Sequence, residues 1–371
     1  MDPSSGLTHL RLHRPDGMTP VVVGEGALSA VLPELQGWLA RRTAFVVTTG
    51  RVLALHGERL DALSRAAGRW VILEVEEGEP AKTVASAERL WNEMLAAGGK
   101  RDSRVIAFGG GSVGDLAGFA AGCFLRGIDF VQIPTTLLAQ VDASIGGKTG
   151  VDLDGGKNTV GLFHHPSMVV CDTGLLPTLP REELRSGLVE VIKMAALLDP
   201  DLFERVEQQL DTLLEGDPEA LGPVVAAAAA AKIGVVERDP TEQGDRRLLN
   251  FGHTLGHAIE TSSGYAGLRH GEAVGYGFLF ALRLALRRGL PPQDAARMHA
   301  LVRRLDLPPL PALVAEDLMA AMARDKKARE SGLVWVLPRS LGEGRMVGGI
   351  STEEVLTELQ DFLRDPLRPS V

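Results

Sequence analysis

The stretch VIAFGGGSVGDLAGFAAG, residues 105–122, decides the fold class of this chain. The short apolar run Val105–Phe108 leads directly into three glycines, residues 109–111, and then into residues with helical spacing. Glycines at a strand-to-helix turn let backbone N–H groups approach a pyrophosphate, and the N-terminus of the following helix favours negative charge. The spacing is not the usual GxGxxG, but a simple tight turn needs one such glycine rather than three. The stretch therefore predicts a nucleotide-binding turn and leaves the nucleotide unspecified.

The chain on both sides of this turn alternates between the same two patterns. Five short runs are apolar almost throughout: Ala44–Thr48, Val71–Val75, Val105–Phe108, Phe130–Ile133 and Met168–Cys171. Three stretches with helical spacing lie between them: Val52–Ala67, Ala81–Ala97 and Val113–Leu125. Such runs suit strands of a parallel sheet that is covered on both faces. We therefore expect an α/β, Rossmann-like, doubly wound domain.

The pattern changes after about Pro180, where helical spacing takes over. We expect helices over Glu182–Leu197, Asp201–Leu214, Glu219–Val236, Leu248–Ser262, Glu272–Arg288, Pro292–Leu305, Leu313–Arg329 and Thr352–Arg364, with a short strand over Leu333–Leu337. Two prolines, Pro177 and Pro180, interrupt the pattern at the change. The sequence predicts two domains, an α/β domain at residues 1–179 and a mostly α-helical domain at residues 180–371.

The chain is acidic, with 39 Lys and Arg against 48 Asp and Glu among its 371 residues and a net charge of −9. A field of that sign repels nucleic acid and anionic membranes, so we expect neither as a partner. The N-terminus lacks the continuous apolar segment of a secretion signal, which favours a cytoplasmic protein. Any site for an anion has to be built locally from basic side chains.

A glycine-dense region, QVDASIGGKTGVDLDGGKNTVG at residues 140–161, contains Asp142, Lys148, Lys157 and Asn158. An isolated lysine is usually a solvated surface group. Here each lysine follows a pair of glycines, which let the backbone fold closely around a ligand. We interpret the region as loops whose lysines pair with a phosphate or a carboxylate.

Three further segments contain residue types that bind metals. His253 and His257 stand four apart and therefore share one face of a helix. Thr254 takes the place of the glutamate in an HExxH motif, which argues against metalloprotease chemistry. His270 follows, and Glu190 lies in an apolar helical stretch where a carboxylate needs a partner. Two histidines and a carboxylate are the ligand set of catalytic zinc, with core histidines and a satisfied glutamate as the alternative.

Six segments together resemble the 3-dehydroquinate synthases, a family of the sugar-phosphate cyclase superfamily. They are GGGSVGDLAGFAAGCFLRG, PTTLLAQVDASIGGKTGV, GGKNTVG, TLPREELRSGLVEVIK, RLLNFGHTLGHAIE and LRHGEAV. The resemblance extends over residues 21–349. It implies an NAD-binding α/β domain and a helical metal- and substrate-binding domain, with the active site in the cleft between them.

The resemblance also implies an activity. A phosphorus–oxygen lyase of this family converts 3-deoxy-D-arabino-heptulosonate 7-phosphate, a small anionic sugar phosphate, to 3-dehydroquinate and phosphate in the shikimate pathway. The steps are transient NAD oxidation, phosphate elimination, reduction, ring opening and intramolecular aldol closure, so no net NADH accumulates. The implied cofactors are NAD and Zn²⁺ or Co²⁺, and the implied assembly is a homodimer.

The resemblance in these segments also implies roles for individual residues. The implied metal ligands are Glu190, His253 and His270. The implied substrate-binding and catalytic residues are Arg126, Asp142, Lys148, Lys157, Asn158, Lys193, Lys232, Glu242, Arg246 and His257, with one of Lys326 and Lys327 as a distal lysine. The implied cofactor-binding residues are Glu79, Lys82, Gly110, Gly111, Ser112, Asp115, Thr135, Thr136 and Thr178, together with Lys148 and Lys157.

One departure concerns the cofactor. The family often has an acidic residue after the strand that here ends near Thr48, where it would bind the adenosine ribose. This chain has Thr49, Gly50 and Arg51 instead, a change that favours NADP relative to NAD. The other cofactor positions match the family, so NAD remains our hypothesis.

Three alternatives remain open. A polyol or iron-type alcohol dehydrogenase would share the two-domain plan, but it would release reduced cofactor and needs no cluster of Lys148, Lys157 and Arg246. Another sugar-phosphate cyclase would act on a different sugar phosphate, although residues 140–161 look closer to 3-dehydroquinate synthase. A silent scaffold protein would be expected to have lost part of its metal and lysine sets.

Overall fold

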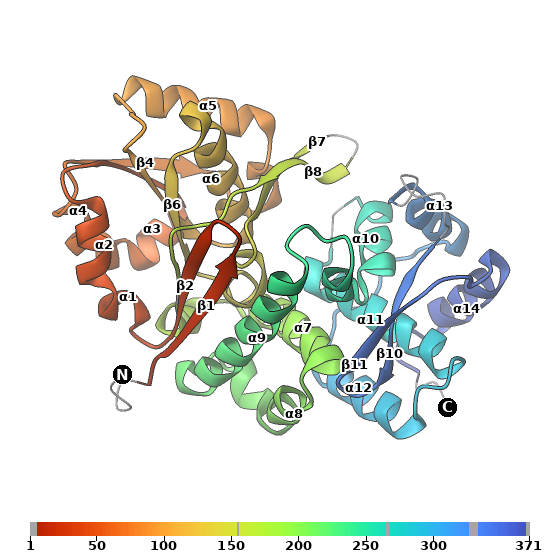
Figure 1. Cartoon of the computed structure of the whole chain (residues 1–371). Coiled ribbons are helices and arrows are strands. Elements are labelled where there is room, and N and C mark those ends of the chain that lie inside the picture. Colours follow the sequence, from red (N-terminus) through yellow and green to blue (C-terminus); the bar gives the residue numbers. More distant parts are fainter. Residues whose placement is uncertain (1–5, 154–155, 265–266, 326–332, 369–371) are drawn as a thin grey trace. The chain divides into compact units, whose positions relative to one another are not determined.

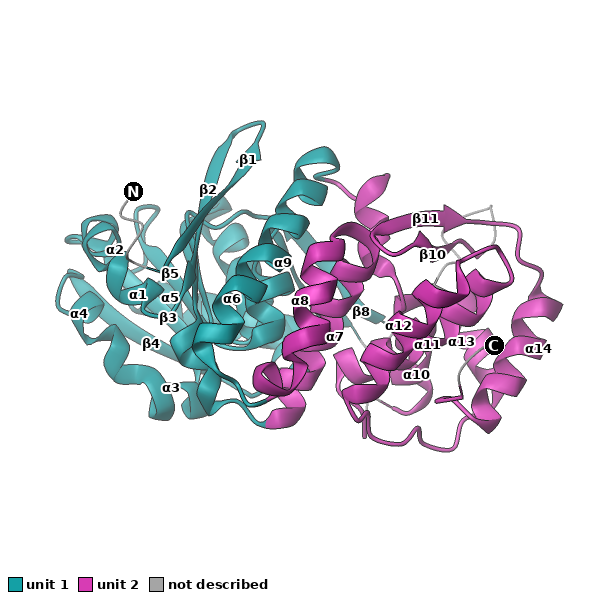
Figure 2. Ribbon diagram, turned by 90° about the horizontal axis from the view of Figure 1, so that it is seen from below, with its two compact units in different colours: residues 1–180, 215–240 teal, residues 181–214, 241–371 magenta. Residues whose placement is uncertain are grey.

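A computed structural model describes residues 6–153, 156–264, 267–325 and 333–368. The chain divides into two compact units, which Figure 2 distinguishes by colour. The first contains Met1–Pro180 and Glu215–Pro240, and the second contains Arg181–Leu214 and Thr241–Val371. The sequence predicted one change near Pro180, whereas residues 215–240 belong to the first unit. This part of the predicted domain division therefore differs from the compact units.

The first unit is built on a seven-stranded sheet with the strand order β1-β2-β9-β6-β5-β3-β4. Its strands are β1 (Thr8–Arg14), β2 (Gly17–Gly24), β3 (Thr43–Thr49), β4 (Arg69–Val75), β5 (Arg104–Gly109), β6 (Asp129–Pro134) and β9 (Val169–Asp172). Only the β1–β2 pair is antiparallel, whereas the other neighbours run parallel. All five predicted apolar runs lie in this sheet, which confirms the α/β, Rossmann-like class.

Helices cover both faces of the sheet, as Figure 1 shows. On one face, α5 (Val84–Ala96) and α6 (Gly111–Cys123) bury residues such as Leu90 and Leu116. On the other face, α1 (Ala27–Ala30), α2 (Leu32–Leu39), α3 (Gly50–His56), η1 (Gly57–Leu60) and α4 (Asp61–Ser64) cover a second apolar cluster. The helix predicted over residues 52–67 is thus broken into three pieces, because the chain leaves α-helical geometry at His56 (φ −136°) and continues through Gly57.

Most of the glycine-dense region forms two paired strands rather than loops. Strands β7 (Lys148–Leu153) and β8 (Gly156–Phe163) pair antiparallel, and β7 packs against α6. A Cβ added at Gly118 of α6 would lie 2.5 Å from Thr149, and one added at Gly161 would lie 2.3 Å from the carbonyl oxygen of Thr149. These two glycines therefore allow close packing of the hairpin, which the sequence pattern did not separate from ligand binding.

The alanine-rich helix α9 (Pro218–Arg238) packs against β1, β2 and the π-turn η4 (Ala139–Ala143). This apolar packing explains why residues 215–240 belong to the first unit. By length and composition α9 is also apolar enough to span a membrane, a feature that the sequence analysis overlooked. Its apolar part is 56% buried, and core helices of soluble proteins can have the same length and composition.

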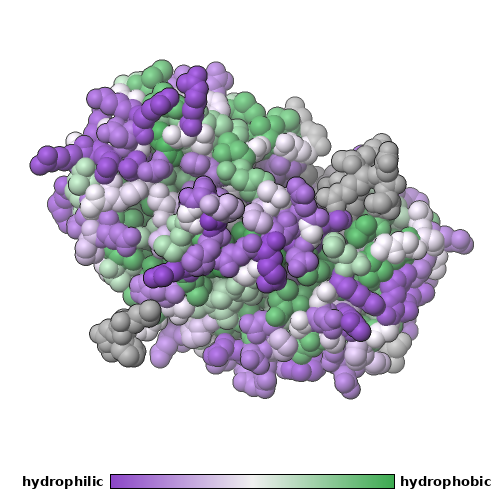
Figure 3. All heavy atoms as spheres, in the orientation of Figure 1, coloured by the Kyte–Doolittle hydropathy of each residue, from purple (hydrophilic) through white to green (hydrophobic). Residues whose placement is uncertain are grey.

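The second unit is mostly helical. It contains α7 (Arg181–Leu198), α8 (Pro200–Leu214), η6 (Asp245–Asn250), α10 (His253–Ser262), α11 (His270–Leu286), α12 (Pro292–Arg304), α13 (Ala315–Asp325) and α14 (Thr352–Arg364). Helix α11 is buried along nearly its whole length, with α7, α10 and α12 among its neighbours. An antiparallel pair, β10 (Trp335–Ser340) and β11 (Glu343–Val347), completes the unit. Hydrophilic side chains cover much of the face in Figure 3.

Candidate functional site

The glycine turn links β5 to α6 as the sequence predicted. Gly110 is the N-cap residue of α6 and provides no side-chain cap, so the first N–H groups of this helix are available to an anion. A Cβ added at Gly110 would lie 3.2 Å from Thr136, and one at Gly111 would lie 3.1 Å from Ala143. The backbone of Thr135 donates to the carbonyl of Gly109 at 2.9 Å. These contacts bring the two threonines after β6 to the glycine turn.

Lys82 is the centre of a polar network beside this turn. Its side chain is 3% exposed, and Nζ donates to Asp115 Oδ2 at 3.0 Å and also to Asn158 Oδ1. Glu79 Oε1 lies 3.5 Å from Lys82 Nζ and 3.6 Å from Lys157 Nζ. The hydroxyl of Ser112 donates to Glu79 Oε2 at 3.0 Å. Six predicted site residues from three separate segments therefore meet here.

Lys82 and Glu79 hold each other in the ionised state, whereas burial raises the pKa of Asp115. Burial lowers the pKa of Lys82, but Asp115 and Glu79 outweigh it, so the pKa lies above its ordinary value. Burial raises the pKa of Glu79, but Lys82, Lys157 and the Ser112 hydroxyl outweigh it and lower the pKa. The network thus offers fixed charges next to the open end of α6.

The β7–β8 hairpin brings its polar residues into this unit. Asn158 adopts a left-handed conformation (φ 53°), and its backbone N–H donates to Asp152 Oδ1 at 2.6 Å. An unfavourable backbone conformation is retained where surrounding contacts demand it, here the side-chain bond to Lys82. Lys148 is exposed at the start of β7, directly after Gly147 (φ 69°).

A second buried lysine of the same unit, Lys232 on α9, pairs with Asp142. Its side chain is almost entirely buried, and Nζ donates to both the carboxylate and the backbone carbonyl of Asp142. Asp142 lies on the π-turn η4, a rare element that often marks functional sites.

The predicted metal ligands converge in the second unit. Glu190 Oε1 lies 3.6 Å from His253 Nε2 and 3.7 Å from His270 Nε2, and candidate ligand atoms of the three residues lie within 4.8 Å of one another. Glu190 is fully buried, and its Oε1 atom has no hydrogen-bond partner within the described residues. Lys193, one helical turn further along α7, forms an ion pair with its other oxygen. A buried carboxylate oxygen facing two imidazole nitrogens fits a divalent cation.

Each imidazole has a partner for its other nitrogen. His253 Nδ1 lies 3.1 Å from the carbonyl oxygen of Phe251, so Nδ1 carries the proton that it donates to this oxygen. In the neutral ring Nε2 then has the free lone pair. Burial, together with Lys193, holds the pKa of His253 well below 6.5, so the ring is neutral. His270 Nδ1 lies 3.2 Å from Glu260 Oε2. Both rings therefore direct Nε2 towards Glu190, as metal-binding histidines do.

Glycines let the helices that carry these ligands approach one another. A Cβ at Gly271 would lie 2.1 Å from the carbonyl oxygen of Ser186, so α11 touches α7 next to His270. A Cβ at Gly277 would lie 1.9 Å from the carbonyl oxygen of Gly252, which brings α11 against the start of α10. This close packing positions the three ligands on three helices.

The second unit contains three further predicted residues that the structure describes, His257, Arg246 and Glu242. The ring of His257 lies 5.2 Å from that of His253 between centroids. Arg246 is 2% exposed on η6, and Glu242 (φ 59°) accepts from Asn250 at 3.0 Å. Lys326 and Lys327 lie outside the described residues.

Two further predicted residues of the first unit, Arg126 and Thr178, have no described contact with the Lys82 network or the glycine turn. Arg126 (φ 69°) follows the far end of α6, about 20 Å from the glycine turn at 1.5 Å per residue over the 13 residues of the helix. Thr178 lies on η5 (Thr173–Thr178), where its hydroxyl is 2.9 Å from Nε2 of His56.

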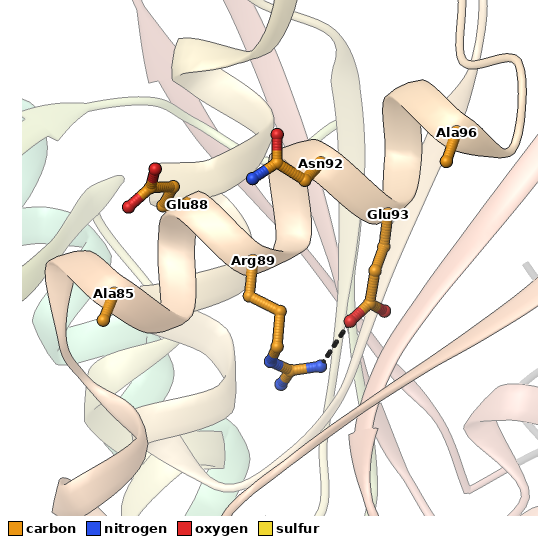
Figure 4. A pocket seen from close by; sticks show the side chains of 6 residues that line it. All are labelled: Ala85, Glu88, Arg89, Asn92, Glu93 and Ala96. Carbon is orange, nitrogen blue, oxygen red and sulfur yellow. Dashed lines mark hydrogen bonds and ion pairs between the residues drawn. The ribbon is translucent and has the colours of Figure 1, made fainter.

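A shallow pocket of about 490 Å³ lies elsewhere, on the outer face of α5. Figure 4 shows its lining, Ala85, Glu88, Arg89, Asn92, Glu93 and Ala96, all from this one helix. None of these residues was predicted for the site, and we assign the pocket no role.

Sequence reasoning missed Glu260, which is 4% exposed and contacts His270. The signal was present, because Glu260 follows His253 by seven residues and His257 by three, which places all three on one helix face.

Comparisons with known proteins identify the family of this chain. The family model described as 3-dehydroquinate synthase N-terminal matches residues 72–186, and the one described as 3-dehydroquinate synthase C-terminal matches residues 187–328. The 3-dehydroquinate synthase of Geobacter metallireducens is 44% identical over 321 residues, 85% of this chain and 89% of the relative. That of Rhodospirillum rubrum is 42% identical over 371 residues, 97% of this chain and 96% of the relative.

Solved structures of similar proteins share the fold. ValA, a 2-epi-5-epi-valiolone synthase from Streptomyces hygroscopicus subsp. jinggangensis 5008 with NAD⁺ and Zn²⁺ bound, has a TM-score of 0.85 and 30% identity, covering 93% of this chain and 97% of its own. A 2-deoxy-scyllo-inosose synthase complexed with carbaglucose-6-phosphate, NAD⁺ and Co²⁺ has a TM-score of 0.85 and 26% identity, covering 96% and 100%. An iron-containing alcohol dehydrogenase from Thermotoga maritima, with a TM-score of 0.69, 18% identity and coverage of 93% and 98%, shares the fold alone.

Proposed function

The chain belongs to the 3-dehydroquinate synthase family, and we propose that it converts 3-deoxy-D-arabino-heptulosonate 7-phosphate to 3-dehydroquinate and phosphate. It is therefore an enzyme, a lyase of that family. One observation carries the proposed reaction. Family-matched residues that are far apart in the sequence assemble into a charged network around Lys82 and into the Glu190–His253–His270 trio.

In this proposal NAD⁺ binds at the glycine turn, where it supplies transient oxidation and re-reduction of the sugar. The uncapped N-terminus of α6 and the close approach of Gly110 to Thr136 support a pyrophosphate there. Lys82 and Glu79 hold each other in place and position Asp115 and Ser112 around the nucleotide. The NAD⁺ bound in the valiolone and inosose synthase structures supports the same cofactor.

Glu190, His253 and His270 would hold Zn²⁺ or Co²⁺, which lowers the pKa of a bound substrate hydroxyl. The buried Oε1 of Glu190 and the two Nε2 atoms fit such an ion. Glu260 and the carbonyl of Phe251 orient the two rings. Lys193 neutralises the remaining carboxylate oxygen of Glu190.

Basic side chains are needed at the site because the chain as a whole is acidic. The proposed substrate carries a phosphate and a carboxylate, and the net charge of −9 cannot attract it. Lys148, Lys157, Lys193, Lys232 and Arg246 provide local positive charge, with Arg126 and Asn158 as further expected contacts. We propose that His257 binds the departing phosphate, and that Asp142 and Glu242 fix the lysine and amide groups beside them.

Both domains are proposed to act on one substrate molecule, because oxidation and metal binding concern the same sugar. Holding the sugar in one orientation then promotes several consecutive steps. We also propose a homodimeric, cytoplasmic enzyme, as the family resemblance implied. Size-exclusion chromatography with light scattering tests the assembly.

The decisive experiment is incubation with the heptulosonate phosphate, catalytic NAD⁺ and Zn²⁺, with phosphate, 3-dehydroquinate and reduced nicotinamide measured together. We expect equimolar phosphate and 3-dehydroquinate without net NADH. Turnover of glucose 6-phosphate or sedoheptulose 7-phosphate in its place would move the assignment to another cyclase. Steady NADH formation from glycerol would instead favour a polyol dehydrogenase.

A further inference from the structure

The carboxylate expected after β3 is absent, but the structure supplies another. In doubly wound folds the acidic residue that binds the adenosine ribose follows the strand next to the glycine-turn strand. Here the glycine turn follows β5, and β3 is a parallel neighbour of β5. Thr49 at the end of β3 uses its hydroxyl to cap α3, accepting from Val52 N at 3.3 Å.

Glu74, on the neighbouring strand β4, covers this position. It pairs in register with Thr48 of β3, one residue from the strand ends. A Cβ added at Gly50 would lie 2.6 Å from Glu74 Oε1, so the carboxylate lies directly against the first residue of α3. Arg89 donates to the backbone carbonyl of Glu74 at 2.8 Å, which holds this part of β4 in place. The Glu74 side chain is exposed and therefore accessible to a ligand.

We propose that Glu74 binds the adenosine ribose hydroxyls and selects NAD⁺ over NADP⁺, an inference that rests on the proposed function. A carboxylate accepts hydrogen bonds from two vicinal hydroxyls and repels a 2′-phosphate. Gly50 is required because any larger residue would displace the carboxylate. The neighbouring Arg51 would by itself favour the 2′-phosphate, so Glu74 determines the preference.

A purely structural role is the competing explanation, because a carboxylate next to the N-terminus of α3 stabilises that helix. The two roles predict different results. Loss of a helix-terminus charge changes the melting temperature and leaves nucleotide preference intact. Loss of a ribose ligand changes the preference and needs no change in melting temperature.

The test is a titration of the full-length protein with NAD⁺ and with NADP⁺ by calorimetry, for the wild type and for Glu74→Gln, Gly50→Ala and Glu88→Gln. Glu88 is an exposed carboxylate on α5, so its variant controls for the change in net charge. We expect the wild type to prefer NAD⁺, and Glu74→Gln to reduce the ratio of NAD⁺ to NADP⁺ affinity about tenfold or more, the range of one charge-assisted contact. Gly50→Ala should reduce the ratio as well, without lowering the melting temperature.

An unchanged ratio in Glu74→Gln would overturn this inference while NAD⁺ binding by the wild type still supported the proposed function. A fall of the same size in Glu88→Gln would overturn it too. Failure of the wild type to bind either nucleotide would overturn the proposed cofactor itself, and this inference with it.

Discussion

Glu260 Oε2 lies 3.2 Å from Nδ1 of His270, and this contact determines which nitrogen of the ring faces Glu190. A proton on Nδ1 that is donated to Glu260 leaves the lone pair of the ring on Nε2 of His270, 3.7 Å from Glu190 Oε1. Glu260 is 4% exposed, so its own charge depends on such partners. One helix face of α10 therefore contributes both a ligand, His253, and the residue that orients another ligand.

Replacing Glu260 should weaken metal binding without removing a ligand. We expect Glu260→Gln to raise the dissociation constant of Zn²⁺ about tenfold and Glu260→Ala to raise it up to about 100-fold, as for other residues that orient metal-bound histidines. Competition with a chromophoric chelator measures both constants. Glu316→Gln, a change of an exposed carboxylate on α13, is the control. Equal affinity of wild type and Glu260→Ala would show that Glu260 does not orient His270.

His270 and Lys148 should separate metal retention from substrate use. His270→Ala removes one of three ligands, so we expect the purified protein to lose its metal. Lys148 belongs to β7 of the other unit, and Lys148→Ala should keep full metal content but lose substrate affinity or turnover. Elemental analysis of both variants, alongside their activity, checks this. Full zinc occupancy in His270→Ala would remove His270 from the ligand set.

Periodicity predicted those elements whose patterns are local. Residues 352–364, predicted as a helix, form α14 with the same bounds, because Val355, Leu359 and Phe362 recur at helical spacing on its buried face. The β1–β2 hairpin escaped notice because β1 exposes most of its residues and shows no apolar run. The β7–β8 hairpin escaped because its glycines, which suggest loops, permit close contact with α6 and between the strands.

The partners of individual charges could not be predicted. Lys82 and Asp115 are 33 residues apart, and Lys232 and Asp142 are 90 apart. These contacts exist because the sheet and α9 bring distant segments together, and no sequence spacing encodes such packing. The three metal-ligand candidates could be proposed from the sequence, because few residue types bind metals and their spacing limits the choice. The contact by which Glu260 orients His270 could be recognised only from the fold.

Gly271 should be intolerant of even a methyl group. A Cβ added at this position would lie 2.1 Å from the backbone oxygen of Ser186, so Gly271→Ala forces α7 and α11 apart. We expect a loss of about 1–3 kcal/mol in the free energy of unfolding, together with weaker metal binding, because Glu190 and His270 lie on these two helices. Urea denaturation and metal titration measure the two effects.

Gly37 provides the matched control for that substitution. It lies within α2, and a Cβ added there meets no described atom within 4 Å beyond its chain neighbours and its own helix backbone. Gly37→Ala should therefore stabilise the protein by about 0.5–1 kcal/mol through helix propensity. A destabilised Gly37→Ala, or an unaffected Gly271→Ala, would contradict the packing account.

His299 should make the protein less stable in mild acid. It is 8% exposed on α12, and burial, together with Arg303 and Arg283, holds its pKa below the ordinary value of 6.5. In the unfolded chain the ring takes up a proton near pH 6.5, whereas the folded protein does so only at lower pH. The unfolded state therefore binds more protons between these two values, and the free energy of unfolding falls as the pH is lowered through this window.

The substitution His299→Gln removes this titration while keeping a neutral polar side chain. We expect the free energy of unfolding of the wild type to fall more steeply than that of His299→Gln between about pH 7.5 and about pH 5.5, with a difference in slope of at most about 1.4 kcal/mol per pH unit. Some pH dependence should remain in the variant, because burial also lowers the pKa of His56. Urea unfolding curves at several pH values provide the comparison. Parallel pH profiles for the two proteins would mean that His299 titrates alike in the folded and unfolded states, against the burial of its ring.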